Sequence, residues 1–282
     1  MNNEEYLKKL HHDLLEILDQ ITFLCEKHDL KYYLVGGTLL GAVRHKGFIP
    51  WDDDLDIAVP RADFNRFIEI CENELPDPFR LKWITNTPDY YQVFAKVYNS
   101  QTLFIEDLGN EKVTDSGIFV DIFPLDETGV YNKEIEFRKW LVSRSVVAMG
   151  RKTLKNTPKL HHRIICALFS NRTINKFAEI IMSFSNGKGY SYYSNFGSQY
   201  PIKRQNIPKC YYGEGLLLPF EDRHYVCPEQ YNKVLSSIYG ENYMQLPPKE
   251  RQRTHYPLKV IFSDQTKIEF EKTNDRISII DQ

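Results

Sequence analysis

The sequence contains few cysteines and no long apolar segment. Its five cysteines are spread over 282 residues without a C-x-x-C pair, which excludes a zinc ribbon or a dense disulfide framework and favours reduced thiols in a cytosol. The polar N-terminus lacks the apolar stretch of a signal peptide, and no apolar run approaches the ~20 residues that cross a bilayer. These absences predict an intracellular, cytoplasmic protein.

A surplus of positive charge is also absent. Lys and Arg total 36 and Asp and Glu total 38, so the formal net charge is −2. Proteins that depend on non-specific nucleic-acid binding usually carry a basic surplus, so we expect no nucleic-acid partner. Basic residues are instead concentrated between residues 144 and 172. This pattern is typical of a solvated helix face, and it also suits peripheral contact with anionic lipid at the inner face of a membrane.

The spacing of apolar residues predicts the order of the elements. Leucines and isoleucines recur every three or four residues from Leu7 to Leu24, which predicts an amphipathic helix to about His28. We expect strands at 32–35, 54–59, 79–84, 92–98, 103–105 and 117–123, the last stopped by Pro124. We expect a short helix capped by Thr38, helices at 63–75 and 229–239, and a helical, basic pattern from 132 to 185. This order predicts an α/β or α+β sheet domain over 30–130, between an N-terminal helix (1–29) and a helical, loop-rich part (131–282).

Four carboxylates occupy five positions at Asp52, Asp53, Asp54 and Asp56. Asp is a poor strand former, and violations of local preference favour functional sites. On a strand, Asp54 and Asp56 would face one way with their Cβ atoms ~6–7 Å apart. Two carboxylates at that spacing can hold a divalent cation such as Mg²⁺ together with substrate phosphates. The alternatives are a Ca²⁺-binding turn or a merely solvated acidic turn.

Two further features belong to the same prediction. The Gly36-Gly37-Thr38 segment lies between an expected strand and an expected helix, where backbone N–H groups can bind an anion, and Arg44 adds positive charge nearby. Asp121 is a lone charge in an apolar strand, so it needs a partner. That partner is either an Arg or backbone N–H groups, or the same metal, with Asp121 as its third ligand and as a base for an attacking hydroxyl.

These motifs resemble the LicD family of phosphotransferases. The resemblance rests on the segments 36–44, 49–57 and 120–126, and more loosely on 218–221, 239–244 and 246–251. It spans roughly residues 30 to 257 and implies an α+β fold of the nucleotidyltransferase type found in DNA polymerase β. Such a fold has a mixed sheet with flanking helices, here followed by a helical and irregular C-terminal part.

The resemblance also implies a reaction. A phospho-alcohol (phosphocholine, ribitol phosphate or glycerol phosphate) would pass from a CDP-linked donor to a hydroxyl of a cell-surface glycan such as teichoic acid, or of its lipid-linked precursor. Asp54, Asp56 and Asp121 would be the catalytic residues and the ligands of Mg²⁺ or Mn²⁺. The expected donor and phosphate contacts are Gly36, Gly37, Thr38, Arg44, Asp52, Arg251 and His255. Two alternatives stay open: transfer of a nucleoside monophosphate to a sugar or other small acceptor, and a non-catalytic carbohydrate- or metal-binding module.

Overall fold

The computed structural model describes residues 2–88, 90–106, 117–153, 168–252, 254, 257–273 and 276–281, with backbone only for 151–153 and 271–281. The helices are α1 (Asn3–Lys27), α2 (Gly36–Arg44), α3 (Arg61–Glu74), α4 (Lys133–Thr153), α6 (Asn171–Ser183), α7 (Ile202–Gln205), α8 (Lys209–Tyr212), α9 (Tyr231–Tyr239) and the 3₁₀ helix η1 (Lys249–Arg251). The strands are β1 (Tyr33–Leu34), β2 (Asp56–Pro60), β3 (Phe79–Lys82), β4 (Ala95–Asn99), β5 (Leu103–Ile105), β6 (Phe119–Thr128), β7 (Tyr192–Ser194), β8 (Asn206–Pro208), β9 (Leu216–Phe220), β10 (Arg223–Cys227), β11 (Lys259–Ile261), β12 (Lys267–Thr273) and β13 (Arg276–Asp281).

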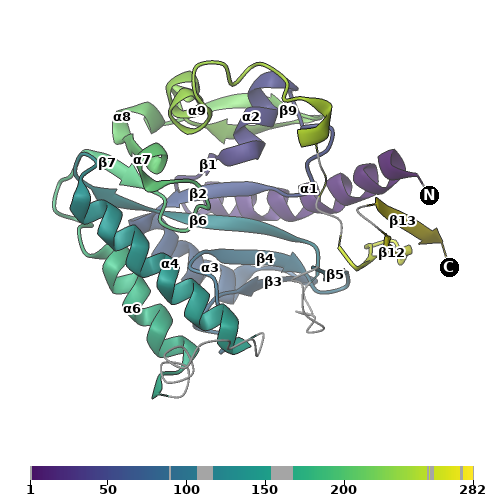
Figure 1. The fold of residues 1–282 in the computed structure, drawn as a ribbon, viewed down its shortest axis with the longest axis horizontal. Coiled ribbons are helices and arrows are strands. Elements are labelled where there is room, and N and C mark those ends of the chain that lie inside the picture. The colour runs from purple at the N-terminus through teal and green to yellow at the C-terminus, as the bar shows by residue number, and fades with distance from the viewer. Residues whose placement is uncertain are drawn as a thin grey trace.

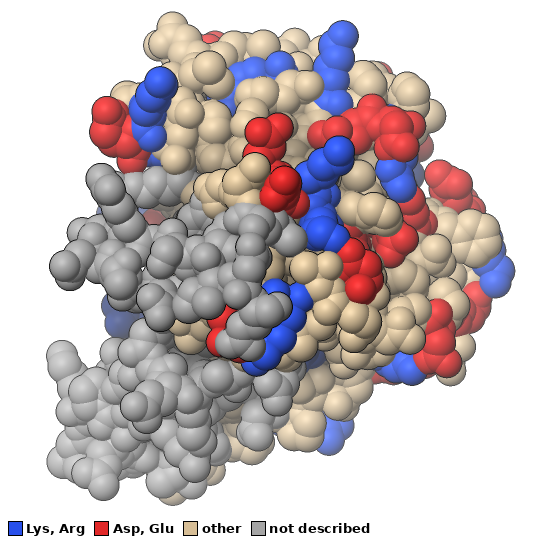
Figure 2. Space-filling view, turned by 90° about the vertical axis from the view of Figure 1, so that its right-hand side faces the viewer, with Lys and Arg blue, Asp and Glu red and all other residues tan. Residues whose placement is uncertain are grey.

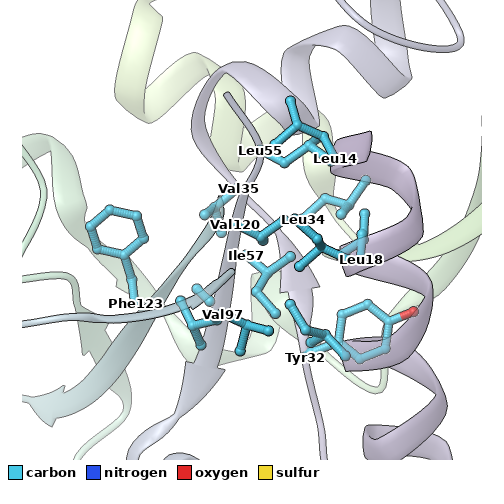
Figure 3. Close-up of a cluster of buried hydrophobic side chains, with 14 of the residues drawn as sticks. Leu14, Leu18, Tyr32, Leu34, Val35, Leu55, Ile57, Val97, Val120 and Phe123 are labelled. Carbon is cyan, nitrogen blue, oxygen red and sulfur yellow. The ribbon is translucent and has the colours of Figure 1, made fainter. Parts of the chain in front are cut away.

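The first helix confirms its predicted pattern. Asn2 caps α1: its side chain accepts from the Glu5 N–H at 2.9 Å, and the Glu5 carboxylate accepts from the Asn2 N–H at 2.9 Å. This reciprocal pair satisfies two of the N–H groups that a helix start leaves without partners. Leu14 and Leu18 then pack against the sheet (Figure 3). The helix therefore covers one face of the sheet along its length.

The main sheet is mixed, as expected for an α+β chain. Within the described residues seven strands form it, with the path β1-β2-β6-β4-β3 and with β7 and β8 attached to the far end of β6. The pair β2 and β6 is parallel, whereas the other pairs are antiparallel. Strands β9 and β10 form a separate hairpin near α2 and α9 (Figure 1). Strands β5, β11, β12 and β13 form a small antiparallel sheet near the N-terminus.

A buried cluster of charged side chains links α3 and α6 to strand β6 of this sheet. The Arg61 guanidinium at the start of α3 donates two hydrogen bonds to the Asp126 carboxylate on β6, at 2.8 and 2.9 Å, and one to Glu179 on α6 at 2.8 Å. Arg61 and Asp126 are only 4% and 0% exposed. Removing Arg61 would leave the Asp126 carboxylate buried without its counterion, which is costly. α4 and α6 pack side by side on this flank (Figure 1) and have a smaller core of their own.

Among the boundaries that differ from the sequence predictions, three concern elements near the site. α2 begins at Gly36, so Thr38 does not cap it; Thr38 lies in the first turn. β2 begins at Asp56 rather than at residue 54. β6 continues through Pro124, which falls between the stretch paired with β4, ending at Ile122, and the stretch paired with β7, beginning at Asp126. A proline there costs no hydrogen bond of those two ladders, so it does not stop the strand.

The surface on the side of the two termini has mixed charge. Acidic and basic side chains are interspersed across the coloured part of this face (Figure 2), in keeping with the net charge of −2. Among the helices that the structure describes, none combines the length and the apolar character needed to cross a bilayer.

Candidate active site

Three charged side chains lie in one row across neighbouring strands. Asp56 on β2 pairs in register with Asp121 on β6, and Asp121 pairs in turn with Lys96 on β4. Ile57 follows Asp56 and Val120 precedes Asp121, and both of these apolar side chains point toward α1 (Figure 3). Because successive side chains alternate between the faces of a sheet, the three charged side chains point to the opposite face. The predicted convergence of carboxylates from two neighbouring strands is therefore present for Asp56 and Asp121.

The row holds more negative than positive charge. Burial raises the pKa of Asp121 to about 7; the charges of Asp54 and Glu106 also raise it, and the Lys96 ammonium, 3.4 Å from Asp121 Oδ1, lowers it. Burial likewise raises the pKa of Asp56 well above its ordinary value, and the charges of Asp54 and Asp121 raise it further. One ammonium thus faces several carboxylates that cannot all ionise without cost.

The glycine turn packs directly on these carboxylates. Gly36 has φ +58°, a left-handed conformation that favours glycine, and a Cβ there would lie 3.2 Å from Asp56 Oδ2. A Cβ on Gly37 would lie 2.8 Å from Asp52 Oδ2. The Thr38 hydroxyl accepts a hydrogen bond from the Asp56 backbone N–H at 2.9 Å. Gly36 therefore needs the conformational freedom of glycine, a side chain at position 37 would displace the Asp52 carboxylate, and Thr38 fixes the position of Asp56.

A cleft of about 500 Å³ opens over this arrangement. It brings together most of the residues predicted from the sequence: Gly36, Gly37, Asp52, Asp54, Asp56, Asp121 and Arg251. Asp54 precedes β2 and is exposed, whereas Arg251 reaches the cleft from η1. A second hollow, of about 340 Å³, adjoins it and shares Asp54 and Asp121, with Lys96 and Glu106 in its wall. Asp54 and Asp121 therefore lie where the two hollows meet.

Some predicted residues are placed elsewhere. Arg44 does not line the cleft, because its guanidinium donates to the backbone carbonyls of Tyr243 and Gln245 at 3.2 and 3.3 Å. Thr38 lies behind the turn, and His255 falls outside the described residues. Glu221 accepts a hydrogen bond from the Phe48 N–H at 2.9 Å and so stabilises a neighbouring turn. The structure gives Arg44 and Glu221 anchoring contacts.

Sequence reasoning missed several residues of the cleft wall. Lys96 is a lone charge in an apolar strand, the same signal that drew attention to Asp121, and its ammonium lies 3.2 Å from the centre of the Phe119 ring. The other missed residues are Gln92, Asn195, Ser198, Gln199 and Tyr239. Tyr200 also lines the cleft, and its ring meets that of Tyr239 edge to face at 5.5 Å. The loop before Tyr200 reaches the site because β7 pairs with β6.

The donor set suits a hard divalent cation. Carboxylate oxygens are the ligands that Mg²⁺ prefers, and the buried Asp121 Oδ1 meets the Lys96 ammonium only at the long distance of 3.4 Å. Among the described residues, His12, Asp13 and Glu16 on α1 place three ligand atoms within 4.8 Å of one another, but Asp13 there accepts two hydrogen bonds from Ser263. The site aspartates stand further apart, as mutually repelling carboxylates do, and a cation between them would relieve that repulsion.

Comparison with known proteins bears on this site. Residues 29–161 match the LicD/FKTN/FKRP nucleotidyltransferase domain. The chain contains a LicD-family domain. It is 29% identical over 260 residues to the lipopolysaccharide cholinephosphotransferase LicD of Haemophilus influenzae, covering 86% of this chain and 92% of that protein. A shorter stretch of 50 residues is 40% identical to the human ribitol 5-phosphate transferase FKRP, covering 18% of this chain and 10% of that protein.

A third similarity is to an uncharacterized protein of Rickettsia typhi, 41% identical over 69 residues, 24% of this chain and 22% of that protein. The LicD-family domain includes the glycine turn and all three site aspartates. It ends before the loop that carries Ser198 and Gln199, and before Arg251. Part of the cleft wall therefore comes from the chain beyond that domain, while the 260-residue similarity to the H. influenzae protein extends over most of the chain.

Proposed function

We propose that this chain transfers a phosphorylated small alcohol from a CDP-linked donor to a hydroxyl of a glycan, with Mg²⁺ or Mn²⁺ as cofactor. The observation that carries the proposal is the in-register pair of Asp56 and Asp121 beside the glycine turn, inside one cleft. The two named relatives support it, because one is a cholinephosphotransferase and the other a ribitol 5-phosphate transferase. The mixed sheet suits the nucleotidyltransferase-like fold that we also propose.

The carboxylates of the charged row would bind the metal ion. A divalent cation held by Asp54, Asp56 and Asp121 would neutralise the donor diphosphate and stabilise CMP as the leaving group. Phosphoryl transfer passes through a loose transition state, so positioning and charge stabilisation do most of the catalysis. Thr38 contributes to positioning, since its hydroxyl holds the Asp56 backbone. Lys96 holds Asp121 on the side away from Asp56.

The glycine turn would bind a phosphate of the donor. The first N–H groups of a helix have no partner within the helix, and α2 begins at Gly36 in the cleft wall. A phosphate placed there would meet backbone N–H donors, and the two glycines add no side chain of their own. Arg251 lines the same cleft and can bind a second phosphate oxygen. The rings of Tyr200 and Tyr239 form an aromatic wall against which a nucleobase or the alcohol group would pack.

Nucleotide release tests the proposal. The protein is incubated with Mg²⁺ and, separately, with CDP-choline, CDP-ribitol, CDP-glycerol and nucleoside triphosphates, with a glycan acceptor. CMP released from a CDP-alcohol supports the proposal. Pyrophosphate released from a triphosphate would assign transfer of a nucleoside monophosphate instead, and no release from any donor would leave a binding module. Asp56→Asn, checked for folding by circular dichroism, is the negative control and should release no CMP.

A further inference from the structure

An apolar ridge remains exposed on the helical part of the molecule. We define the ridge as the large apolar side chains that face solvent on α4, on α6 and directly before and after α6: Phe137, Trp140, Val147, Leu168, Phe169, Phe177, Ile180 and Phe184. Trp140 is 50% exposed, Phe177 52% and Ile180 66%. Single exposed apolar residues are common on proteins, whereas a contiguous group marks an interaction surface.

The ridge is additional to the packing of the helices. α6 buries one stripe, formed by Ile174, Ala178 and Met182, in the small core that it shares with α4. Its second stripe, Phe177 and Ile180 with Phe184 after it, points to solvent. A helix that needs only one apolar face for folding does not require a second. A groove of about 440 Å³ runs between the helices, lined by Trp140, Phe169 and Phe177 among others, with Arg144 as its charged residue.

Positive charge accompanies the ridge. Arg144 on α4 and Arg172 and Lys176 on α6 are exposed on the helices that carry the ridge, in a chain whose net charge is −2. The Arg144 guanidinium lies 5.7 Å from the Trp140 ring, and Lys188 Nζ lies 3.8 Å from the Phe184 ring. Apolar and aromatic side chains bordered by cations match the interface of an anionic bilayer, where rings enter the headgroup layer and cations contact phosphate. Two copies of this surface would instead bring like charges together.

The inner faces of the same two helices make hydrogen bonds to residues that line the active-site cleft. Asn175 on α6 donates to the Gln92 carbonyl at 2.9 Å. Lys139 on α4 donates to the carbonyls of Phe196 and Ser198 at 2.7 and 2.5 Å. Gln92 and Ser198 both line the cleft. A surface bound through the ridge would therefore lie beside the helices that shape the substrate site.

We propose that the ridge on α4 and α6 docks the protein peripherally on an anionic phospholipid bilayer. The docking does not depend on the proposed reaction, since it rests on exposed apolar area and charge alone. If the proposed reaction also holds, docking would bring the cleft to acceptors carried on lipid. Trp140 provides a direct reporter, because Trp83 is buried at 5% exposure and the remaining tryptophan, Trp51, lies in the cleft wall.

Vesicle binding tests the docking. The full chain is mixed with vesicles of phosphatidylcholine alone, or of phosphatidylcholine with an equal amount of phosphatidylglycerol, and binding is followed by co-sedimentation and tryptophan emission. We expect binding to the anionic vesicles, weakened by added salt, with a blue shift that is lost in Trp140→Phe. The double variant Phe177→Glu, Ile180→Glu should bind about 30-fold more weakly or worse, from the loss of two inserted apolar side chains.

Phe23→Glu is the matched control, because Phe23 is also a helix residue and is 59% exposed, but lies on α1. Circular dichroism and the unfolding midpoint establish that each variant is folded. Absence of wild-type binding to anionic vesicles would overturn the proposal, as would an equal loss of binding in Phe23→Glu. Self-association of the wild type that the double variant abolishes, without any vesicle binding, would assign the ridge to a second copy of the chain and overturn the proposal as well.

Discussion

Replacing Asp121 by Asn is expected to stabilise the metal-free protein at alkaline pH and to change it little at acidic pH. Burial and the Asp54 charge raise the pKa of Asp121 to about 7 in the folded state, whereas an unfolded Asp titrates near pH ~3.9. Between these values the folded state holds a proton that the unfolded chain releases. The unfolding free energy of the wild type therefore falls as pH rises through this window.

The size of the effect follows from the same two values. The difference between the folded and unfolded pKa values of Asp121 corresponds to about 4 kcal/mol. The unfolding free energy of Asp121→Asn should therefore rise relative to that of the wild type by up to this amount between pH ~4 and pH ~8. Urea denaturation with EDTA present measures the unfolding free energy at each pH. Asp264→Asn is the matched control with the opposite sign, because hydrogen bonds from Lys9 and Thr266 lower the pKa of Asp264 to about 2. A difference between Asp121→Asn and wild type that does not vary with pH would refute the reasoning.

Two further predictions concern how the site is held. Thr38→Val removes the acceptor of the Asp56 N–H at nearly constant volume, so we expect a loss of about 1–3 kcal/mol in unfolding free energy and slower CMP release; Thr38→Ser should retain both, and equal behaviour of the two variants would argue against the positioning role. Arg61→Met leaves Asp126 buried without its cation, and we expect it to cost about 3–5 kcal/mol in thermal or urea denaturation. Arg66→Met on the same helix, where the side chain is 55% exposed, should cost less than 1 kcal/mol or so.

The parts of the site that the sequence could predict are local. Asp56 and Asp121 violate the apolar pattern of their own strands, and Gly36 and Gly37 lie where a strand meets a helix. Such signals depend on neighbours along the chain, so they can be seen without a structure. A metal shared by Asp56 and Asp121 requires their two strands to lie side by side, and the parallel pairing of β2 with β6 places them so.

The parts that could not be predicted depend on pairing between distant segments. Lys96 meets Asp121 because β4 runs antiparallel to β6, and Ser198 reaches the cleft because β7 pairs with the far end of the same strand. Arg44 is held by carbonyls two hundred residues later in the chain. Pro124 was expected to end its strand, but the cost of a missing N–H depends on which strand lies beside it. None of these relations has a signal in the local sequence.

The central claim is that Asp54, Asp56 and Asp121 bind one divalent cation together with the diphosphate of the donor beside the glycine turn. Calorimetric titration with CDP, the part common to the candidate donors, tests it most directly. The account predicts that CDP binds the wild type in Mg²⁺ and binds at least ten-fold more weakly in EDTA, a difference of about 1.4 kcal/mol or more, and that Asp56→Asn shows no gain from Mg²⁺. Equal CDP affinity with and without Mg²⁺, or an undiminished Mg²⁺ effect in Asp56→Asn, would contradict it.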